Sequence, residues 1–187
     1  IIDDASTDDT WKILSTFTDD RILFKRNHRN LGISRSLNIA GQLASGTYLA
    51  RHDQDDISHK HRIRHQVEFL HANPNVVAVG TWIRLRRYYG STFHDSLPRR
   101  QHPVSDANIR LLLMWNNPFV HGSVMMRRIA FEKCGGYLED INITPPEDYE
   151  LWTRMSALGE FANIPIPLLT YQINPIGMSQ TRSEEIF

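Results

Sequence analysis

The strongest chemical signal in the sequence is the run Asp53-Gln54-Asp55-Asp56, which directly follows the apolar segment 47–51. That segment is predicted to be a strand, and ligands of open α/β sheets bind at the carboxyl ends of strands. We expect no neighbouring Lys or Arg to neutralise the three carboxylates, which then repel one another unless a cation lies between them. Hard divalent cations such as Mg²⁺ and Mn²⁺ prefer these oxygen ligands and bridge to phosphates. The pattern indicates a metal and phosphate site; the alternative is an acidic turn that caps the next helix.

Two further acidic pairs stand where elements begin or end. Asp3-Asp4 follows the apolar Ile1-Ile2, and Glu147-Asp148 follows Pro145-Pro146. Acidic residues are also expected in the first turn of a helix, because the helix dipole favours them there. Each pair is therefore open to two interpretations, helix-terminus chemistry or a carboxylate that works in a cleft, for example as a general base.

His121-Gly122-Ser123 is a weaker candidate for a place in the cleft, because glycine lets the backbone approach a ligand closely. The pattern favours an ordinary strand over that role. Cys134 is interpreted as a small buried apolar residue and not as a nucleophile. All four tryptophans are expected to pack in the interior: Trp11, Trp82, Trp115 and Trp152. The sequence contains no glycine-rich phosphate loop of the P-loop or dinucleotide type.

The elements that must position these residues alternate between strands and helices. Strands are predicted over 22–24, 47–51, 76–85, 119–126, 161–164 and 167–171, and helices over 7–17, 32–44, 60–72, 106–115, 127–133 and 145–157. The residues expected to face the core are Ile13, Leu14 and Phe17 in the first helix and Ile63, Val67 and Leu70 in the third. Residues 86–105 are interpreted as a β-ribbon or loop. This alternation predicts an α/β fold with a mostly parallel central sheet flanked by helices.

Composition limits the class of protein. The 187 residues carry 21 Lys and Arg against 21 Asp and Glu, with 41% apolar and 22% charged residues. This is typical of a globular protein, and the balanced charge argues against a dedicated nucleic-acid binder. Residues 51–102 nevertheless hold nine Lys or Arg against five acids. That excess indicates either a solvated face or a surface that meets phosphates or an anionic membrane.

The chain is long enough for one domain with a sizeable core. Because Ile1–Asp4 has the pattern of the end of a buried inner strand, we expect the domain to begin upstream, with the first strand absent here. Otherwise a partner chain would cover the open sheet edge.

Six motifs follow one another in a recognisable order: IIDDASTDDT, NLGISRSLNIAGQLASGTYLARHDQDD, RIRHQVEFLHANPNVVAVGTW, NPFVHGSVMMRR, CGGY and EDYELWTRM. Together they cover residues 1 to about 171. In this order the chain resembles the family 2 glycosyltransferases, which have the nucleotide-sugar-binding type A fold. The nearest resemblance is to bacterial transferases that build lipopolysaccharide, capsule or exopolysaccharide.

The resemblance implies a donor site on the first part of the chain. Asp4, with Asp3 beside it, would contact the nucleotide base. Asp53 and Asp55 match the ends of the family's DxD motif, which would hold Mn²⁺ or Mg²⁺ and the ribose or diphosphate of the donor. Asp56 extends that motif and would share either role.

The resemblance also implies the catalytic side. Asp148 matches the catalytic base, Glu147 would help to hold the acceptor, and His121 would lie near the diphosphate or the acceptor. Within a single glycosyltransferase domain, residues 1–103 would then bind the nucleotide sugar, 104–175 would hold the acceptor and the base, and 176–187 would be a loose tail. Gln172 and Asn174 depart from the family's usual ending.

The implied function is the inverting, metal-dependent transfer of a sugar, from a UDP-sugar by family expectation, to a saccharide or lipid-linked saccharide. The implied location is the cytoplasm, either free or peripherally associated with the inner face of the plasma membrane. Two alternatives stay open on the residues alone. One is a sugar-phosphate nucleotidyltransferase, and the other is a non-catalytic or truncated module that binds a nucleotide sugar.

Overall fold

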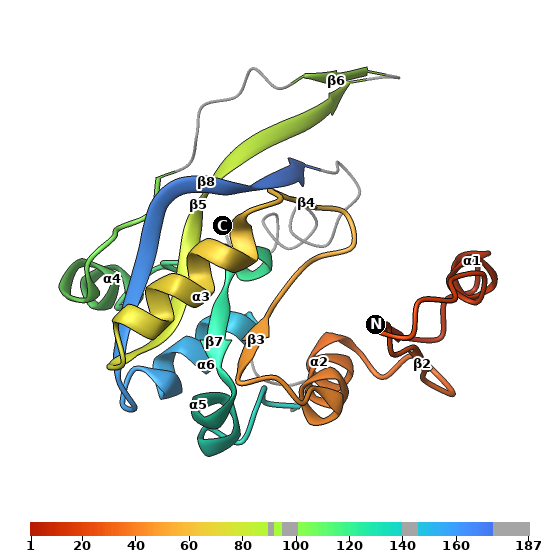
Figure 1. Ribbon diagram of the computed structural model, residues 1–187, viewed down its shortest axis with the longest axis horizontal. Coiled ribbons are helices and arrows are strands. Elements are labelled where there is room, and N and C mark those ends of the chain that lie inside the picture. Colours follow the sequence, from red (N-terminus) through yellow and green to blue (C-terminus); the bar gives the residue numbers. More distant parts are fainter. Residues whose placement is uncertain (90–91, 95–100, 140–145, 174–187) are drawn as a thin grey trace.

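The computed structural model describes residues 1–89, 92–94, 101–139 and 146–173 (Figure 1). Its strands are β1 (Ile2–Asp3), β2 (Lys25–Arg26), β3 (Tyr48–Ala50), β4 (Ile57–Ser58), β5 (Val76–Tyr89), β6 (Thr92–His94), β7 (Met125–Arg127) and β8 (Glu160–Ile173). Its helices are α1 (Thr10–Leu14), α2 (Ile33–Leu43), α3 (Arg62–Ala72), α4 (Asp106–Leu113), the 3₁₀ turn η1 (His121–Ser123), α5 (Arg128–Lys133) and α6 (Glu147–Met155). The α/β class expected from the sequence is confirmed.

The main sheet has six strands, with β3-β7-β5-β8-β4 in order and β6 paired to β5. The two long strands β5 and β8 run parallel, whereas the pairs β3–β7, β5–β7, β4–β8 and β5–β6 are antiparallel. A second, two-stranded sheet pairs β1 with β2 in parallel. The described sheet is therefore mixed, and the expectation of mostly parallel strands is wrong in this respect. Short strands such as β4 and β7 join it in the opposite sense.

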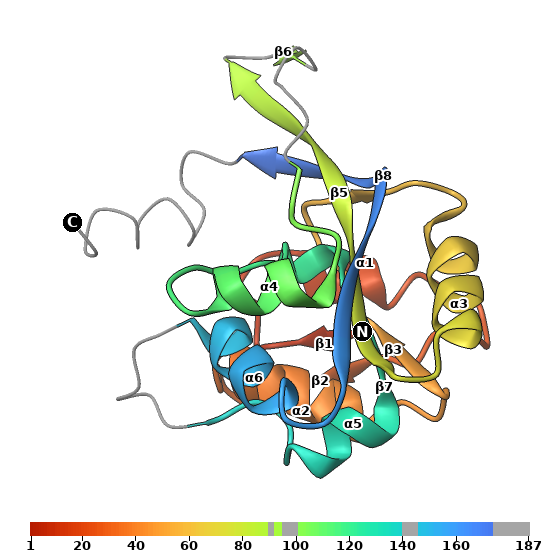
Figure 2. The same ribbon diagram turned by 90° about the vertical axis from the view of Figure 1, so that its left-hand side faces the viewer.

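Helices cover both faces of the main sheet, as the turned view shows: α3 lies on one side of β5 and β8, and α4 and α6 lie on the other (Figure 2). One buried apolar cluster contains Ile109 of α4, Phe131 of α5 and Trp152 of α6. The other contains Leu70 of α3 and Val79 of β5. These two clusters bury the central strands on both faces of the sheet. The strand ends next to the candidate residues are therefore held in place.

Helix α3 differs from the prediction in the face that it buries. Ile63, expected in the core, is 50% exposed, whereas the fully buried positions are Arg62, Gln66 and Leu70. The Gln66 side-chain amide donates to the carbonyls of Val79 and Ser123 over 3.0 and 2.9 Å. Polar side chains occupy the buried face because their hydrogen bonds to buried backbone carbonyls compensate for the burial.

The β1–β2 sheet and α1 lie at one end of the molecule, beyond α2 (Figure 1). Helix α1 has no buried residue, and Ile13 and Phe17 are more than half exposed, so the expected apolar face is not covered within the described chain. The strand predicted over 22–24 is displaced to β2, which begins at Lys25. Trp115, also expected to pack, is 64% exposed.

Three other segments differ in detail. The strand predicted over 119–126 is replaced by η1 followed by β7. The two strands predicted over 161–164 and 167–171 form the single strand β8, with register shifts opposite Trp82. Residues 86–105 contain the predicted ribbon, since β6 pairs with the end of β5. The predicted tail over 176–187, like Asn174, lies outside the described residues.

Candidate active site

The acidic loop, residues 53–56, leaves β3 and meets η1. A Cβ atom added to Gly122 would lie 2.6 Å from Asp53 Oδ2 and 2.8 Å from Asp56 Oδ2. Both carboxylates therefore point at the backbone of Gly122, at a distance that only glycine permits. The structure brings together Asp53 and Asp56 here, and it places the Asp55 side chain at the surface.

Two arginines surround the acidic loop, which contradicts the expectation that no cation neutralises it. Arg51 contacts Asp53 Oδ1 through Nη2 at 2.5 Å. Arg62 is 1% exposed, and it donates to Gly122 O over 2.7 Å and to the carbonyl of Arg51. Burial lowers the pKa of Arg62 to about 10, with the charge of Asp56 acting in the opposite direction, so the guanidinium stays charged at neutral pH.

Asp56 retains an unused oxygen in spite of these cations. Its Oδ1 accepts the Gln172 N–H of β8 over 3.1 Å, whereas the buried Oδ2 has no hydrogen-bond partner among the described residues. Burial raises the pKa of Asp56 to about 7, and the charges of Asp53 and Asp55 act in the same direction. A buried carboxylate oxygen without a donor is costly, which is the signature of a site that a ligand completes.

The acidic loop fits a hard divalent cation. Asp53 and Asp56 converge on one point, and the unpaired Asp56 Oδ2 faces the space that a side chain at Gly122 would fill. The described residues contain no group of three or more His, Cys, Asp or Glu that could hold a metal by themselves. That is consistent with Mg²⁺-type sites, which use one or two carboxylates and take their remaining ligands from waters and substrate phosphates.

His121 of η1 lies near the carboxylate of Glu147, the first residue of α6. His121 Nε2 lies 2.7 Å from the hydroxyl of Tyr137, and Nδ1 lies 3.8 Å from Glu147 Oε1. Burial lowers the pKa of His121 well below its usual value and raises that of Tyr137, so both are uncharged at neutral pH. The phenol can then donate to Nε2, which leaves the Nδ1 proton directed at Glu147.

Asp148 is 6% exposed and has a donor at each oxygen. The Asn117 amide donates to Oδ2 over 2.7 Å, and the Tyr149 N–H donates to Oδ1 over 2.8 Å. Burial, followed by the neighbouring Glu147, raises the pKa of Asp148 to about 6. A carboxylate that is mostly ionised at pH 7 but far more basic than usual suits proton abstraction.

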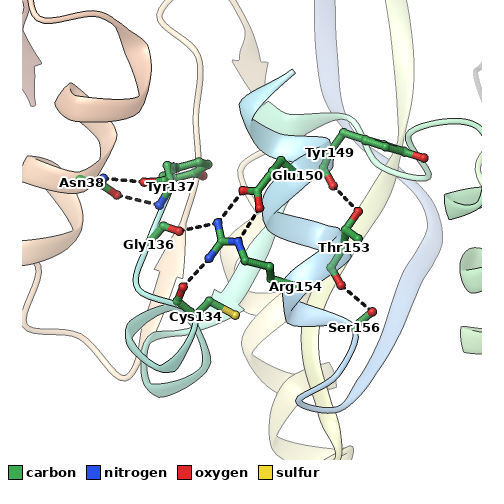
Figure 3. A network of polar contacts seen from close by, with 9 residues as sticks. All are labelled: Asn38, Cys134, Gly136, Tyr137, Tyr149, Glu150, Thr153, Arg154 and Ser156. Atoms are coloured by element: carbon green, nitrogen blue, oxygen red, sulfur yellow. Dashed lines mark hydrogen bonds and ion pairs between the residues drawn. The ribbon is translucent and has the colours of Figure 1, made fainter. Parts of the chain in front are cut away.

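A polar network holds α6 and Tyr137 in place (Figure 3). Arg154 pairs with Glu150 one turn earlier and donates to the carbonyls of Cys134 and Gly136. The next residue, Tyr137, is held by the amide of Asn38 on α2, which both donates to and accepts from its backbone. The loop after α5 is thereby tied to two helices, and it carries the Tyr137 ring that contacts His121.

Asp3 and Asp4 form a separate cluster around the start of α2. Asp4 accepts from the Asn27 side chain and from the Leu31 and Gly32 N–H groups over 2.8–2.9 Å. Burial raises the pKa of Asp4, but these hydrogen bonds outweigh it and the pKa is lowered. Asp3 is 3% exposed and pairs with Arg26 at 3.0 Å. These contacts tie Asp3 and Asp4 to β2 and to the segment that leads into α2. None of them joins the two residues to the acidic loop.

Sequence reasoning missed four residues of the site: Arg51, Arg62, Asn117 and Gln172. Arg51 stands two residues before Asp53, so its position in the sequence could have identified it as a partner of the acidic loop. Asn117 and Gln172 reach the site through tertiary contacts that span between 31 and 117 residues of sequence. Arg62 makes one contact across 60 residues, to Gly122, and a shorter one across 11 residues, to Arg51. Cys134, in contrast, is half-buried and burial raises the pKa of its thiol, in line with the inert role predicted.

The chain has the nucleotide-sugar-binding type A fold. The model of Glycosyl transferase family 2 matches residues 1–135, and the chain belongs to this family. It is 39% identical over 159 residues to the UDP-Glc:alpha-D-GlcNAc-diphosphoundecaprenol beta-1,3-glucosyltransferase WfaP of Escherichia coli, covering 85% of this chain and 58% of that protein. The chain spans about half the length of the curated relatives that it matches.

Solved structures confirm the fold. Mannosyltransferase PcManGT from Pyrobaculum calidifontis, in complex with GDP-Man and Mn²⁺, aligns with a TM-score of 0.70 at 19% identity, covering 98% of this chain and 50% of that one. TarS 1-349 of S. aureus, in complex with UDP-GlcNAc, aligns with a TM-score of 0.71 at 15% identity, covering 96% and 50%. Within the described residues, no helix is both long and apolar enough to cross a membrane.

Proposed function

We propose that the chain carries the donor site and the catalytic base of an inverting sugar transfer from a nucleotide-diphosphate sugar to an acceptor hydroxyl. The proposal rests on one observation: carboxylates of the acidic loop and a carboxylate of α6 both lie beside η1. Gly122 faces Asp53 and Asp56, and the adjacent His121 faces Glu147. A donor whose diphosphate lies at the acidic loop would present its anomeric carbon toward Asp148.

On the donor side, Asp53 together with Asp55 or Asp56 would hold Mn²⁺ or Mg²⁺. The family resemblance assigns Asp55, whereas the geometry favours Asp56, because its Oδ2 faces the same point as Asp53. When bound, such an ion offsets the negative charge that develops on the leaving diphosphate. Asp3 and Asp4 would contact the nucleotide base from the β1–β2 end. The nucleotide proposed is UDP, the one carried by the donor in the name of the WfaP relative.

In the reaction, Asp148 accepts the proton of the acceptor hydroxyl while the oxygen of that hydroxyl attacks the anomeric carbon. The bond from that carbon to the diphosphate breaks on the opposite face, and the diphosphate leaves with the electron pair. Configuration is inverted because there is a single displacement. Glu147, held near His121, would orient the acceptor.

The acceptor proposed is a saccharide, free or linked to a lipid diphosphate, in bacterial surface polysaccharide synthesis. The E. coli relative acts on a diphosphoundecaprenol-linked sugar, by its name. An apolar surface also stands near the base: Leu111, Met114 and Trp115, at the end of α4, are 54%, 76% and 64% exposed. Trp115 is two residues before Asn117, which contacts Asp148. Aromatic rings of this kind stack on sugars or contact lipid.

The proposed location is the cytoplasm, at the inner face of the plasma membrane, where a lipid-linked acceptor is presented. The proposed division of labour has residues 1–103 binding the donor and 104–175 holding the acceptor and the base. The two parts share one sheet, since β5 of the first pairs with β8 of the second. A partner chain at the free edge of the β1–β2 sheet also stays a proposal.

Isothermal calorimetry tests the donor site. We expect UDP to bind with Mn²⁺ and much more weakly without it, and GDP and ADP to bind less well. Asp53→Asn should abolish the Mn²⁺-dependent affinity. Comparison of Asp55→Asn with Asp56→Asn identifies the second ligand, and Asp20→Asn, an exposed acid on another loop, is the control. Equal UDP affinity with and without Mn²⁺ in every variant would show that the acidic loop is not the donor site.

A further inference from the structure

The loop after α4 approaches the candidate base through a single side chain, Asn117. We propose that Asn117 is a positioning residue, which orients the Asp148 carboxylate and favours its ionised form during transfer. This inference rests on the proposed function, in which Asp148 is the base. Asn117 itself is not placed in contact with donor or acceptor.

The orientation of the Asn117 amide is fixed by its other contact. Its Oδ1 accepts the backbone N–H of Phe119 over 3.1 Å, so the NH₂ group must be the end that faces Asp148. That NH₂ donates to Asp148 Oδ2 over 2.7 Å. With the Tyr149 N–H on Oδ1, each carboxylate oxygen has one donor, and the plane of the carboxylate is held at two points.

The electrostatic surroundings explain why such a donor is needed. Burial and the negative charge of Glu147 both favour protonated Asp148, and a protonated carboxyl cannot act as a base. From the packed loop after α5, Tyr137 faces the same region as an uncharged phenol, and His121 of η1 is uncharged as well. Among the described side chains, the Asn117 amide is the donor that opposes protonation. Hydrogen bonds to an ionised group are about twice as strong as neutral ones.

The position of Asp148 does not depend on Asn117 alone. The Tyr149 hydroxyl donates to Leu113 O over 2.6 Å, which joins the end of α4 to the first turn of α6. Asp106 of α4 accepts the Phe161 N–H of β8 over 2.8 Å. Loss of the Asn117 amide should therefore change the titration of Asp148 more than it changes the fold.

The test compares Asn117→Ala with Asn116→Ala in the full-length enzyme. Asn116 is its exposed neighbour on the same loop, and its side chain contacts only the Asn117 N–H among the hydrogen bonds described. For Asn117→Ala we expect the acidic limb of the kcat profile to move upward by at least about one pH unit, because a charge-assisted hydrogen bond is lost. Because the pKa of Asp148 is about 6, a rise of one unit should lower the rate at pH 7 about twofold and the rate at pH 5 about tenfold, with recovery toward pH 9 and unchanged nucleotide affinity. Asn116→Ala should keep the wild-type profile.

Infrared titration of the Asp148 carboxyl, taken as the difference from Asp148→Asn, gives its pKa without reference to activity. Asn117→Ser, whose hydroxyl can still accept the Phe119 N–H and adds no charge beside Asp148, serves as a second variant if Asn117→Ala does not fold. An unmoved Asp148 titration and an unmoved pH profile would overturn the positioning role. Wild-type transfer by Asp148→Asn would instead overturn the proposed function, so the two failures are distinct.

Discussion

The acidic loop and the α6 carboxylates both lie beside η1, but their surroundings differ. The acidic loop stands between two guanidinium groups, those of Arg51 and Arg62, and still has an unpaired oxygen on Asp56. Asp148 has two uncharged donors, from Asn117 and the Tyr149 backbone, and a negative neighbour.

The difference indicates two kinds of chemistry. Fixed positive charge around the acidic loop lets several carboxylates remain ionised close together. A metal cation can then bind to the carboxylates, and a diphosphate can bind to that cation. Neutral donors and burial around Asp148 leave it ionised but basic, because no cation among the described side chains holds its charge. A site for a charged donor and a site for proton removal can thus be built from the same residue type.

The largest effect is expected when Arg62 is replaced. Arg62→Met should lower the free energy of unfolding by about 3–5 kcal/mol, because it leaves Asp56 with less compensation and strips donors from two buried carbonyls. Urea unfolding measures the change. Arg64→Met, on the exposed face of the same helix, should cost under about 0.5 kcal/mol. Equal losses in the two variants would mean that Arg62 does not hold the acidic loop together.

In the α6 region, Asp148→Asn should reduce the rate of sugar transfer at least about 100-fold, the usual scale for a general base. Donor affinity measured by calorimetry should be unchanged, because Asp148 lies outside the acidic loop. The assay is the rate of sugar transfer at saturating donor. A parallel fall in donor affinity would make Asp148 a donor-site residue and remove the contrast between the two regions.

Gly122→Ala tests how closely the acidic loop approaches η1. The added methyl would lie within 3 Å of two carboxylate oxygens, so Asp53 or Asp56 must move. We expect Mn²⁺-dependent UDP affinity to fall about 10–100-fold, as when residues that support a metal ligand are changed. Gly46→Ala, whose nearest new contact is Tyr48 O at 3.2 Å, is the control. Undiminished affinity in Gly122→Ala would argue against a ligand between these carboxylates.

The pH dependence of transfer sharpens the comparison on the α6 side. Asp148 works only when ionised and its pKa is raised to about 6, so kcat should fall about tenfold per pH unit below that value and level off above it. The effect on stability has the opposite sign. Because the folded pKa lies above the unfolded value of 3.8, stability falls as pH rises through this window. A kcat that stays flat down to pH 5 would be inconsistent with Asp148 as the base.

The smallest effect is expected at the exposed end of α4. Trp115→Ala should raise the KM for the acceptor by about 2–12-fold, since one aromatic contact contributes about 0.5–1.5 kcal/mol. Trp115→Phe should recover most of the affinity, and the KM for the donor should not change. Ile63→Ala, which changes another exposed apolar residue, on α3, is the control. A change in donor KM alone would place Trp115 on the donor side of the site.

The sequence alone determined the elements and the chemistry that they carry. Strand β3 running into Asp53–Asp56, helix α2 and the acidic start of α6 follow from local patterns of apolar residues, glycine and proline. Residue types and their spacing are local properties, so the three acidic clusters could be found without tertiary structure. The order of the motifs was enough to predict the family.

Tertiary structure decided which of these residues meet. Arg62 and Gln66 occupy the buried face of α3, where apolar residues would be expected. They are buried there because they donate to the backbone carbonyls of Gly122, Ser123 and Val79, which come close to α3 only in the folded chain. The convergence of Asp53 and Asp56 on Gly122, like the donor that Asn117 offers Asp148, is likewise a contact between distant segments. Burial of a polar group depends on the partner that compensates it, and no pattern along the sequence specifies that partner.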